Sequence, residues 1–236
     1  MRVINRLVIV SGVAVAALLS PPASSPSASA AACSDVEVVF ARGTFEAPGV
    51  GGVGQAFVDS LRSKIGDKSM DVYAVNYPAS LDFATAANGV IDARNKVQDV
   101  ANTCPDTKIV LGGFSQGAAV AGYITADAVP PGFTLPQGIT GPMPPDVADH
   151  VAAVTLFGKP SNGFLQTINT AAPPITVGSL YSGKTLDLCA PADPICTPGG
   201  GGDGAAHNAY PVNGMTDQAA TYAAASVMGD NSERSR

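Results

Sequence analysis

Short apolar runs alternate with longer helix-like stretches along most of the chain. Runs of this length, rich in β-branched residues, are typical of buried strands. They predict five strands, at Val36 to Ala41, Met70 to Val75, Lys108 to Gly112, Val151 to Phe157 and Lys184 to Leu188. The remaining stretches predict helices near Gln55 to Ile65, Asp82 to Thr103, Ala118 to Ala121 and Asp217 to Met228. Strands alternating with helices indicate an α/β fold with a parallel sheet covered on both faces, in which ligands collect at the carboxyl ends of the strands.

The third predicted strand leads into Gly113-Phe114-Ser115-Gln116-Gly117, which matches the G-x-S-x-G nucleophile elbow. In this motif a tight turn between strand and helix lifts the serine hydroxyl clear of the backbone. Gly113 and Gly117 lack the Cβ atoms that would collide in so sharp a turn. A chain with 26 glycines can contain such a pattern by chance, but its place between a strand and a helix favours Ser115 as a nucleophile.

Residues 1–32 resemble a secretory signal peptide, because Arg2 and Arg6 precede an apolar run over residues 7–19 and a small-residue stretch follows it. The apolar run is too short for a comfortable membrane span. A lipid anchor on Cys33 is the competing interpretation, but no leucine stands where a lipobox would need one. We therefore expect a secreted protein that is extracellular or associated with the cell wall.

The chain beyond the predicted signal is long enough for one good-sized core and shows no second domain. We expect a single domain over residues 33–230, followed by a flexible tail over residues 231–236. The chain has 13 basic and 19 acidic residues, and this acidic balance argues against a nucleic-acid partner and against charge-driven binding to anionic lipid. We expect a monomer without stable membrane insertion.

Four cysteines follow the predicted signal, namely Cys33, Cys104, Cys189 and Cys196. An even number in an exported chain favours two disulfides, and neither their spacing nor the two histidines suggests a zinc site. Of the three possible connectivities we favour Cys33 with Cys104 and Cys189 with Cys196, because the second pair closes a very small loop.

The general base for Ser115 has to be one of the two histidines, His150 or His207. His150 stands at the amino end of a predicted strand, which is the wrong edge of a parallel sheet for this nucleophile. His207 follows the last strand in a predicted loop, and α/β-hydrolases carry their triad in the chain order Ser, acid, His. The sequence therefore favours His207.

The acid that orients this base lies between the nucleophile and the base, where Asp187, Asp193 and Asp203 are candidates. Asp187 sits inside a predicted strand, where a structural hydrogen bond in the sheet is the simpler role. Asp203 lies in the glycine run over residues 199–204, where nothing in the sequence holds it. Asp193 stands beyond the strand and inside the small disulfide loop, which would fix its position, so we predict Asp193 as the acid.

An oxyanion hole in this fold uses the N–H after the nucleophile and an N–H from the loop after an early strand. Gln116 supplies the first. Thr44 supplies the second, from the loop after the first predicted strand, and its hydroxyl could add another donor. In a chain without a triad, Thr44 would be read as an ordinary turn residue.

With these motifs the chain resembles the cutinase family, and more narrowly the cutinase-like secreted esterases of mycobacteria and related actinobacteria. The matching segments are VVFARGT (Val38 to Thr44), VYAVNYPAS (Val72 to Ser80), IVLGGFSQGAAV (Ile109 to Val120) and the Cys189-x3-Asp193-x2-Cys196 loop, with His207 beyond it. The resemblance implies a compact three-layer α/β-hydrolase with a central five-stranded parallel sheet, no large lid and the two disulfides favoured above. It assigns the catalytic triad to Ser115, Asp193 and His207 and the oxyanion hole to Thr44 and Gln116.

Two segments depart from the family pattern. The stretch from Ala128 to Asp146 is rich in proline and glycine and is longer, at Pro130 to Pro145, than in the compact fungal members; it predicts a surface loop rather than a lid. The glycine run over residues 199–204 lengthens the approach to His207. Both departures bear on substrate size rather than on the chemistry.

These features predict a serine esterase that hydrolyses carboxylic esters with short to medium acyl chains through an acyl-enzyme, without metal or organic cofactor. Its partner would be an ester or lipid substrate. One alternative is a lipase or phospholipase that acts on long-chain lipids. Another is a secreted surface or antigen-like protein with a silent hydrolase scaffold, against which the complete Ser, Asp and His set argues.

Overall fold

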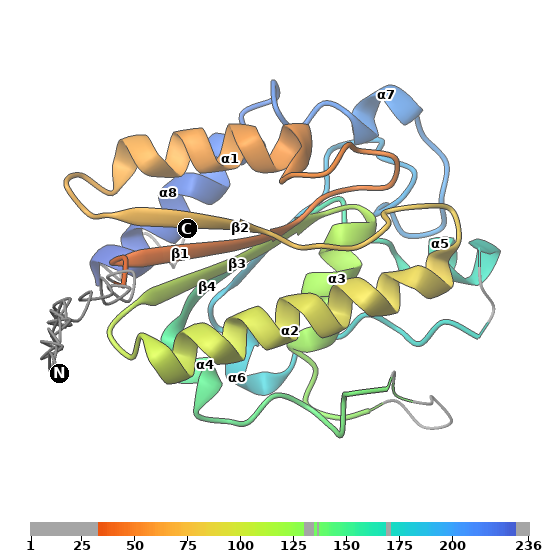
Figure 1. Cartoon of the computed structure of the whole chain (residues 1–236). Helices are drawn as coiled ribbons and strands as arrows, with labels where there is room; N and C mark the ends of the chain where they lie inside the picture. The colour runs from red at the N-terminus through yellow and green to blue at the C-terminus, as the bar shows by residue number, and fades with distance from the viewer. Residues whose placement is uncertain (1–32, 130–134, 136, 169–170, 230–236) are drawn as a thin grey trace, which may run out of the picture. The chain divides into compact units, whose positions relative to one another are not determined.

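The computed structural model describes residues 33–129, 135, 137–168 and 171–229 (Figure 1). The predicted signal peptide over residues 1–32 and the predicted tail over residues 231–236 lie outside the described residues, as does part of the proline-rich segment. From Cys33 on, the described residues belong to one compact unit. No helix within them is both long and apolar enough to span a bilayer.

Five parallel strands form a single sheet in the order β2-β1-β3-β4-β5 (Figure 1). The strands are β1 (Val36–Ala41), β2 (Met70–Ala74), β3 (Lys108–Phe114), β4 (Val151–Phe157) and β5 (Thr185–Leu188). All five predicted strands are present. β3 runs two residues further than the sequence predicts, whereas β2 and β5 are each one residue shorter.

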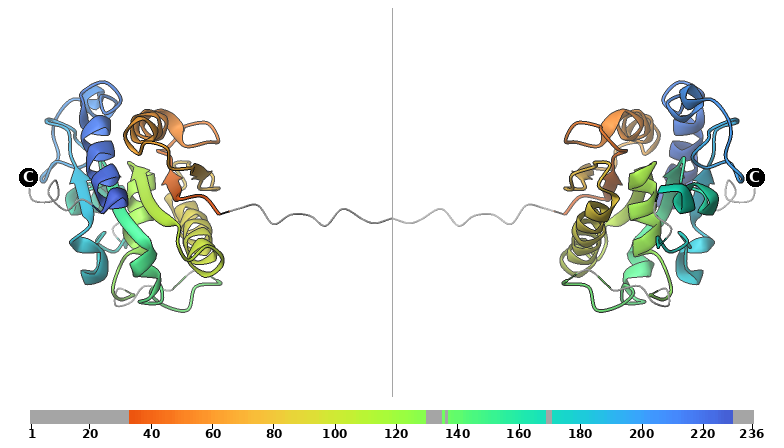
Figure 2. Two further views of the ribbon diagram at one scale, coloured as in Figure 1. Left: turned by 90° about the vertical axis from the view of Figure 1, so that its left-hand side faces the viewer. Right: turned by 90° about the vertical axis from the view of Figure 1, so that its right-hand side faces the viewer.

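Helices cover both faces of the sheet, as the end-on views of Figure 2 make clear. One face carries α1 (Gly51–Lys64) and α8 (Met215–Met228), and the other carries α2 (Ala86–Thr103) and α3 (Gln116–Ile124). Along β1, Val38 and Phe40 belong to the core beneath α1 and α8, while Val39 and Ala41 belong to the core beneath α2 and α3. A strand covered on both faces is apolar at every position, which explains the unbroken hydrophobic run of β1.

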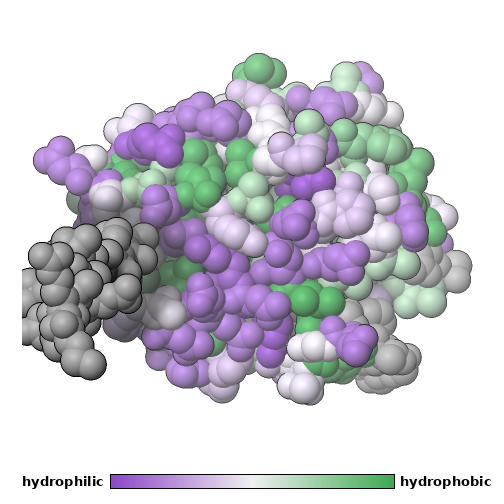
Figure 3. Space-filling model, viewed as in Figure 1, coloured by the Kyte–Doolittle hydropathy of each residue, from purple (hydrophilic) through white to green (hydrophobic). Residues whose placement is uncertain are grey.

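The two cores hold most of the large apolar side chains. Phe40, Phe57 and Phe157 pack together beneath α1 and α8, with ring centroids 5.8 to 6.2 Å apart. On the outer surface seen in Figure 3, hydrophilic residues predominate over the centre and hydrophobic residues occur in small groups between them. Burial of the apolar faces is therefore what holds the helices on the sheet.

α1 begins at Gly51, four residues before the predicted start, because the carboxylate of Glu46 offsets the weak helix propensity of two glycines. The Glu46 carboxylate accepts a hydrogen bond from the Gly52 N–H at 2.6 Å. A negative charge at a helix N-terminus satisfies otherwise unpaired N–H groups and interacts favourably with the helix dipole. The sequence pattern carries no signal for this contact across a loop.

The helix predicted over Asp82 to Thr103 is divided into the 3₁₀ turn η1 (Phe83–Thr85) and α2. Several further one- or two-turn helices lie in segments that the sequence analysis left as loops, namely α4 (Val147–His150), α5 (Asn162–Ile168), α6 (Ser179–Ser182) and α7 (Gly204–His207). Elements of this length contain too few turns for a hydrophobic period to be recognised. His207 accordingly stands at the end of a short helix, not in the loop that we expected.

Both disulfides join the cysteines that the sequence favoured. Cys33 is bonded to Cys104, which ties the start of β1 to the end of α2. Cys189 is bonded to Cys196 across a separation of 7 residues, directly after β5. Cross-links of this kind restrict the unfolded chain and so favour the folded state.

The strand order reverses between β1 and β3, since the chain first adds β2 on one side of β1 and then β3 on the other. Open α/β sheets bind ligands outside the carboxyl ends of the strands at such a switch point. The register pairs Ala41 with Gly113, so the loop after β1 and the turn after β3 leave the sheet side by side. These two turns contain Thr44 and Ser115.

Candidate active site

Ser115 occupies a strained turn between β3 and α3. Its φ of 54° and ψ of −117° lie outside the regions that non-glycine residues normally adopt, and such a backbone costs on the order of 1–3 kcal/mol. The Ser115 N–H donates to the Phe157 carbonyl at 2.9 Å, which anchors the turn to β4. A Cβ on Gly113 would lie 2.2 Å from the Gly117 carbonyl oxygen, and one on Gly117 would lie 2.0 Å from that of Ala41. The two glycines of the motif are therefore needed for close backbone approach.

The loop that contains Thr44 is held by Arg42 and Glu46. The buried Arg42 guanidinium donates to three backbone carbonyls, those of Glu46 at 2.9 Å, Val75 at 3.4 Å and Tyr77 at 2.6 Å. The Glu46 carboxylate accepts from the Gly43 N–H at 2.6 Å as well as from the start of α1. The sequence analysis missed both residues as positioning groups, because their partners lie in other segments of the chain.

Within the part of the chain that the structure describes, none of the hydrogen bonds uses the N–H groups of Thr44 and Gln116. Gln116 is the first residue of α3, where N–H groups have no partner inside the helix. Its side chain is buried and donates to the Ser80 carbonyl at 3.0 Å. This leaves the two N–H groups that the sequence analysis assigned to the oxyanion hole available for a ligand.

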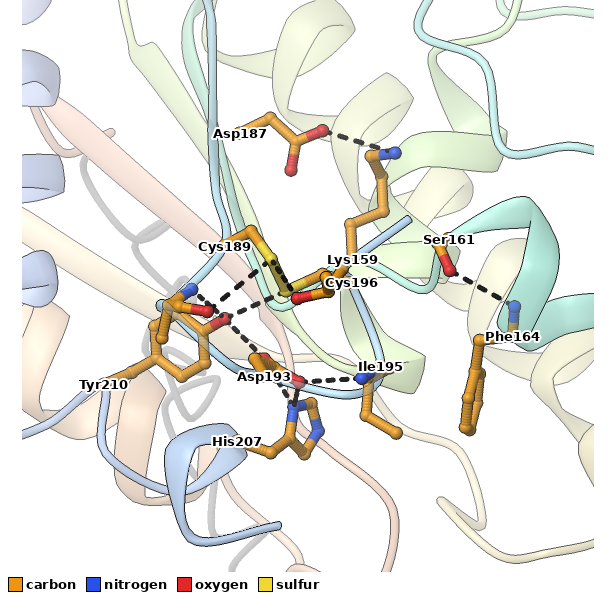
Figure 4. Close-up of a disulfide and its surroundings, with 12 residues drawn as sticks. Lys159, Ser161, Phe164, Asp187, Cys189, Asp193, Ile195, Cys196, His207 and Tyr210 are labelled. Atoms are coloured by element: carbon orange, nitrogen blue, oxygen red, sulfur yellow. Dashed lines mark hydrogen bonds and ion pairs between the residues drawn. A yellow bond between two sulfur atoms is a disulfide. The ribbon is translucent and has the colours of Figure 1, made fainter. Parts of the chain in front are cut away.

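Asp193 and His207 form a hydrogen-bonded pair beside the small disulfide (Figure 4). His207 Nδ1 lies 2.9 Å from Asp193 Oδ1 and 2.8 Å from Oδ2. Asp193 is fully buried, with 0 % of its surface exposed, and its Oδ1 also accepts from the Ile195 N–H at 2.9 Å. A carboxylate on Nδ1 leaves Nε2 without a proton and so able to accept one.

Two aromatic residues that the sequence analysis did not single out complete this arrangement. Tyr210 donates its hydroxyl proton to Asp193 Oδ2 at 2.7 Å and accepts from the Ala190 N–H at 3.0 Å (Figure 4). Burial raises the pKa of Tyr210 above its ordinary value, which keeps the phenol a donor. The Phe114 ring stacks on the His207 imidazole with centroids 4.7 Å apart. Tyr210 has no motif that would reveal it, whereas Phe114 lies inside the elbow.

The glycine run before His207 is a structured turn. Gly199, Gly200, Gly201 and Gly202 all have positive φ, and a Cβ on Gly202 would lie 2.0 Å from the Ala192 carbonyl oxygen. Asp203, which we expected to be held by nothing, caps α7 by accepting from the Ala205 N–H at 2.9 Å. A cap of this kind stabilises the helix that carries His207.

The rejected candidates lie apart from this pair. The Asp187 carboxylate forms an ion pair with Lys159 at 3.3 Å (Figure 4), not the hydrogen bond within the sheet that we expected. Burial raises the pKa of Asp187, although Lys159 opposes the effect. His150 ends α4, immediately before β4, and its Nδ1 lies 3.1 Å from the Pro105 carbonyl oxygen. It therefore lies at the amino edge of the sheet, away from Ser115.

A cavity of about 340 Å³ brings the candidate groups together. Ser115, Gln116, Thr44 and His207 all line it, and most of the other lining side chains are apolar. Elsewhere in the described ranges, no group of three or more His, Cys, Asp and Glu residues is placed to hold a metal ion. The arrangement has the parts that acyl transfer needs, namely a hydroxyl on an elbow, an imidazole oriented by a carboxylate, and N–H groups for a developing oxyanion.

The fold and the elbow define the chain as an α/β-hydrolase. A model of the family described as Cutinase matches residues 32–227. The chain therefore belongs to the cutinase family.

Named relatives agree with this membership. The chain is 53% identical over 222 residues to "Carboxylesterase Culp1" of Mycobacterium tuberculosis, covering 92% of this chain and 94% of the relative. It is 47% identical over 214 residues to "Phospholipase Culp4" of the same species, covering 91% and 88%. Among solved structures, the cutinase of Trichoderma reesei in complex with a phosphonate inhibitor has a TM-score of 0.60 and 30% identity, covering 83% of this chain and 77% of that one. The protein is a carboxylic ester hydrolase.

Proposed function

We propose that the protein is a secreted serine esterase that hydrolyses esters with short to medium acyl chains through an acyl-enzyme on Ser115. The observation that carries this proposal is the Asp193–His207 hydrogen bond at 2.8 Å, formed by a histidine that lines the same cavity as Ser115. It supports the triad more strongly than the elbow motif does, because the segment that contains Asp193 and His207 lies far from the elbow in the sequence and yet meets it at one cavity.

In the proposed reaction, Ser115 Oγ attacks the ester carbonyl carbon while His207 Nε2 accepts the hydroxyl proton. The N–H groups of Thr44 and Gln116 hold the negative oxygen of the tetrahedral intermediate. The intermediate expels the alcohol, which takes the proton from His207, and leaves the acyl group on Ser115. Water then attacks the acyl-enzyme with His207 again as base, and the carboxylic acid leaves.

Export is part of the proposal. Two disulfides favour an oxidising compartment, and residues 1–32 have the pattern of a signal peptide. We propose that the mature protein is a single domain that starts near Cys33 and acts as a monomer outside the cell or in the cell wall.

Titration with an organophosphonate tests the nucleophile. We expect one equivalent of reagent to be bound covalently and to be found on the peptide that contains Ser115, and we expect Ser115→Ala to take up none. Ser161 provides a matched control, since it also precedes a helix but its Oγ accepts from the Phe164 N–H at 3.2 Å. Ser161→Ala should keep full labelling. A folded wild-type protein that takes up no reagent would favour the silent scaffold, and a label that remains in Ser115→Ala would overturn the assignment.

Long-chain lipids are the second candidate substrates. A relative that is 47% identical is named a phospholipase, and a second apolar cavity adjoins the cleft.

A further inference from the structure

A cavity of about 410 Å³, larger than the cleft that holds Ser115, lies beside that cleft. Neither Ser115 nor His207 lines it. Four residues line both cavities, namely Phe83, Ala86, Tyr123 and Ala172. The two cavities are therefore neighbours that share these four lining residues.

One face of α2, together with the preceding turn η1, runs along both cavities. Phe83 and Ala86 line both, while Ala87, Val90 and Arg94 line the second cavity alone. Residues three or four apart lie on one side of a helix, so this stripe is continuous from the cleft to the second cavity. Its members are hydrocarbon in character except for Arg94.

The facing walls continue in the same way. On α3, Ala119 lines the cleft, Tyr123 lines both cavities and Ile124 lines the second. After α5, Ala172 lines both cavities and Pro173 lines the second. Three separate segments thus contribute apolar side chains to both cavities.

Two polar side chains that line the second cavity, Tyr123 and Arg94, are paired with backbone carbonyls. The Tyr123 hydroxyl donates to the Pro173 carbonyl at 2.7 Å, and burial raises the pKa of Tyr123 to about 12, so it stays neutral. Arg94 donates to the carbonyls of Gly141 at 2.7 Å and Pro142 at 3.1 Å. With these groups paired inside the protein, the cavity offers a ligand mainly apolar surface.

We propose that this second cavity binds the distal methylenes of a long acyl chain whose ester carbonyl is at Ser115. The proposal rests on the proposed acyl-enzyme and extends its substrate class to long-chain acyl esters. A flexible hydrocarbon chain fits a cavity that adjoins the cleft and is lined mainly by apolar side chains, because a hydrocarbon needs no hydrogen-bond partner there.

Filling the cavity tests the proposal. Ala87→Phe and Ala126→Phe each place a ring at a residue that lines the second cavity but not the cleft. Asn88→Phe is the matched control, because Asn88 is exposed and adjacent on α2. The measurement is kcat/KM on p-nitrophenyl butanoate and p-nitrophenyl palmitate, with the palmitate ester kept below its aggregation threshold.

We expect the butanoate rate to stay within about twofold in all variants and the palmitate rate to fall about tenfold or more in Ala87→Phe and Ala126→Phe, since each methylene left in water loses about fourfold in binding. Asn88→Phe should leave the ratio of the two rates unchanged. If both filling variants keep the wild-type ratio, the cavity does not bind the chain and the proposal fails.

Phosphonate titration of each variant separates this result from failure of the catalytic assignment. Full labelling with an altered palmitate to butanoate ratio supports the cavity proposal. Full labelling with an unchanged ratio overturns it and leaves the Ser115 mechanism standing. Hydrolysis of butanoate that persists in Ser115→Ala would overturn the mechanism and, with it, the cavity proposal.

Discussion

Replacing Asp193 with asparagine tests the site most directly, because every neighbour of this carboxylate is a donor. Oδ1 accepts from the Ile195 N–H and lies 2.9 Å from His207 Nδ1. Oδ2 accepts from the Tyr210 hydroxyl and lies 2.8 Å from the same nitrogen. An asparagine amide keeps one acceptor oxygen and replaces the other with an NH₂ group. This NH₂ group then faces an N–H or O–H group that donated to the carboxylate, so two donors oppose each other.

The structure determines the consequence for either orientation of the amide. If the NH₂ group points at His207, the imidazole places its proton on Nε2, which can no longer accept the Ser115 proton. If the NH₂ group points at Ile195 or Tyr210, a buried donor loses its partner. The wrong tautomer lowers turnover by about four orders of magnitude, or about 5.4 kcal/mol in activation free energy. The unpaired donor costs about 1–3 kcal/mol in the free energy of unfolding.

The assay is kcat on a soluble short-chain ester, with denaturant unfolding to confirm that the variant is folded. We expect Asp193→Asn to lose nearly all turnover with little change in KM. The matched control is Asp187→Asn, which removes the ion pair with Lys159 outside the Asp193–His207 pair and should retain most activity. Mild loss in Asp193→Asn together with severe loss in Asp187→Asn would refute the assignment of the acid.

Three further predictions follow from the described contacts. Tyr210→Phe should lower the free energy of unfolding by about 1–3 kcal/mol and reduce kcat more than it changes KM, because the Ala190 N–H loses its acceptor and Asp193 loses a donor. A variant with the wild-type unfolding curve and the wild-type kcat would contradict this. Hydrogen bonds from Lys64 and Ser60 lower the pKa of Asp217 from 3.8, so its contribution to stability is present at neutral pH and is lost as the pH falls through the lowered folded-state value. Asp217→Asn should therefore lower Tm at neutral pH but not at strongly acidic pH, and a difference that persists in acid would disprove the linkage. Hydrolysis of soluble short-chain esters should show no jump at the micelle threshold, and a large jump would assign a lid role to residues 130–145.

The sequence by itself determined the features that depend on neighbours along the chain. The strands β1, β3 and β4 are buried on both faces and form nearly continuous apolar runs, so they could be predicted. The edge strands β2 and β5 are more exposed and each contain an aspartate, and each is one residue shorter than predicted. The elbow at Ser115 is a local turn that needs glycines at fixed offsets. Asp193 could be selected because a short disulfide loop constrains it, and His207 because of chain order. Both of these choices rest on spacing and order along the chain, which can be read without any knowledge of packing.

Only the tertiary structure decided which distant groups surround those residues. Tyr210 reaches Asp193 because α7 and the turn after it fold back over the disulfide loop, and no pattern within either segment encodes that contact. Asp203 looked unsupported and proved to cap the helix that carries His207. Three of the segments that line the second cavity are residues 83–94, 123–126 and 172–176. Hydrophobic periodicity reports which face of an element is buried but not what lies opposite, so the cavity emerged only when these three segments were packed together.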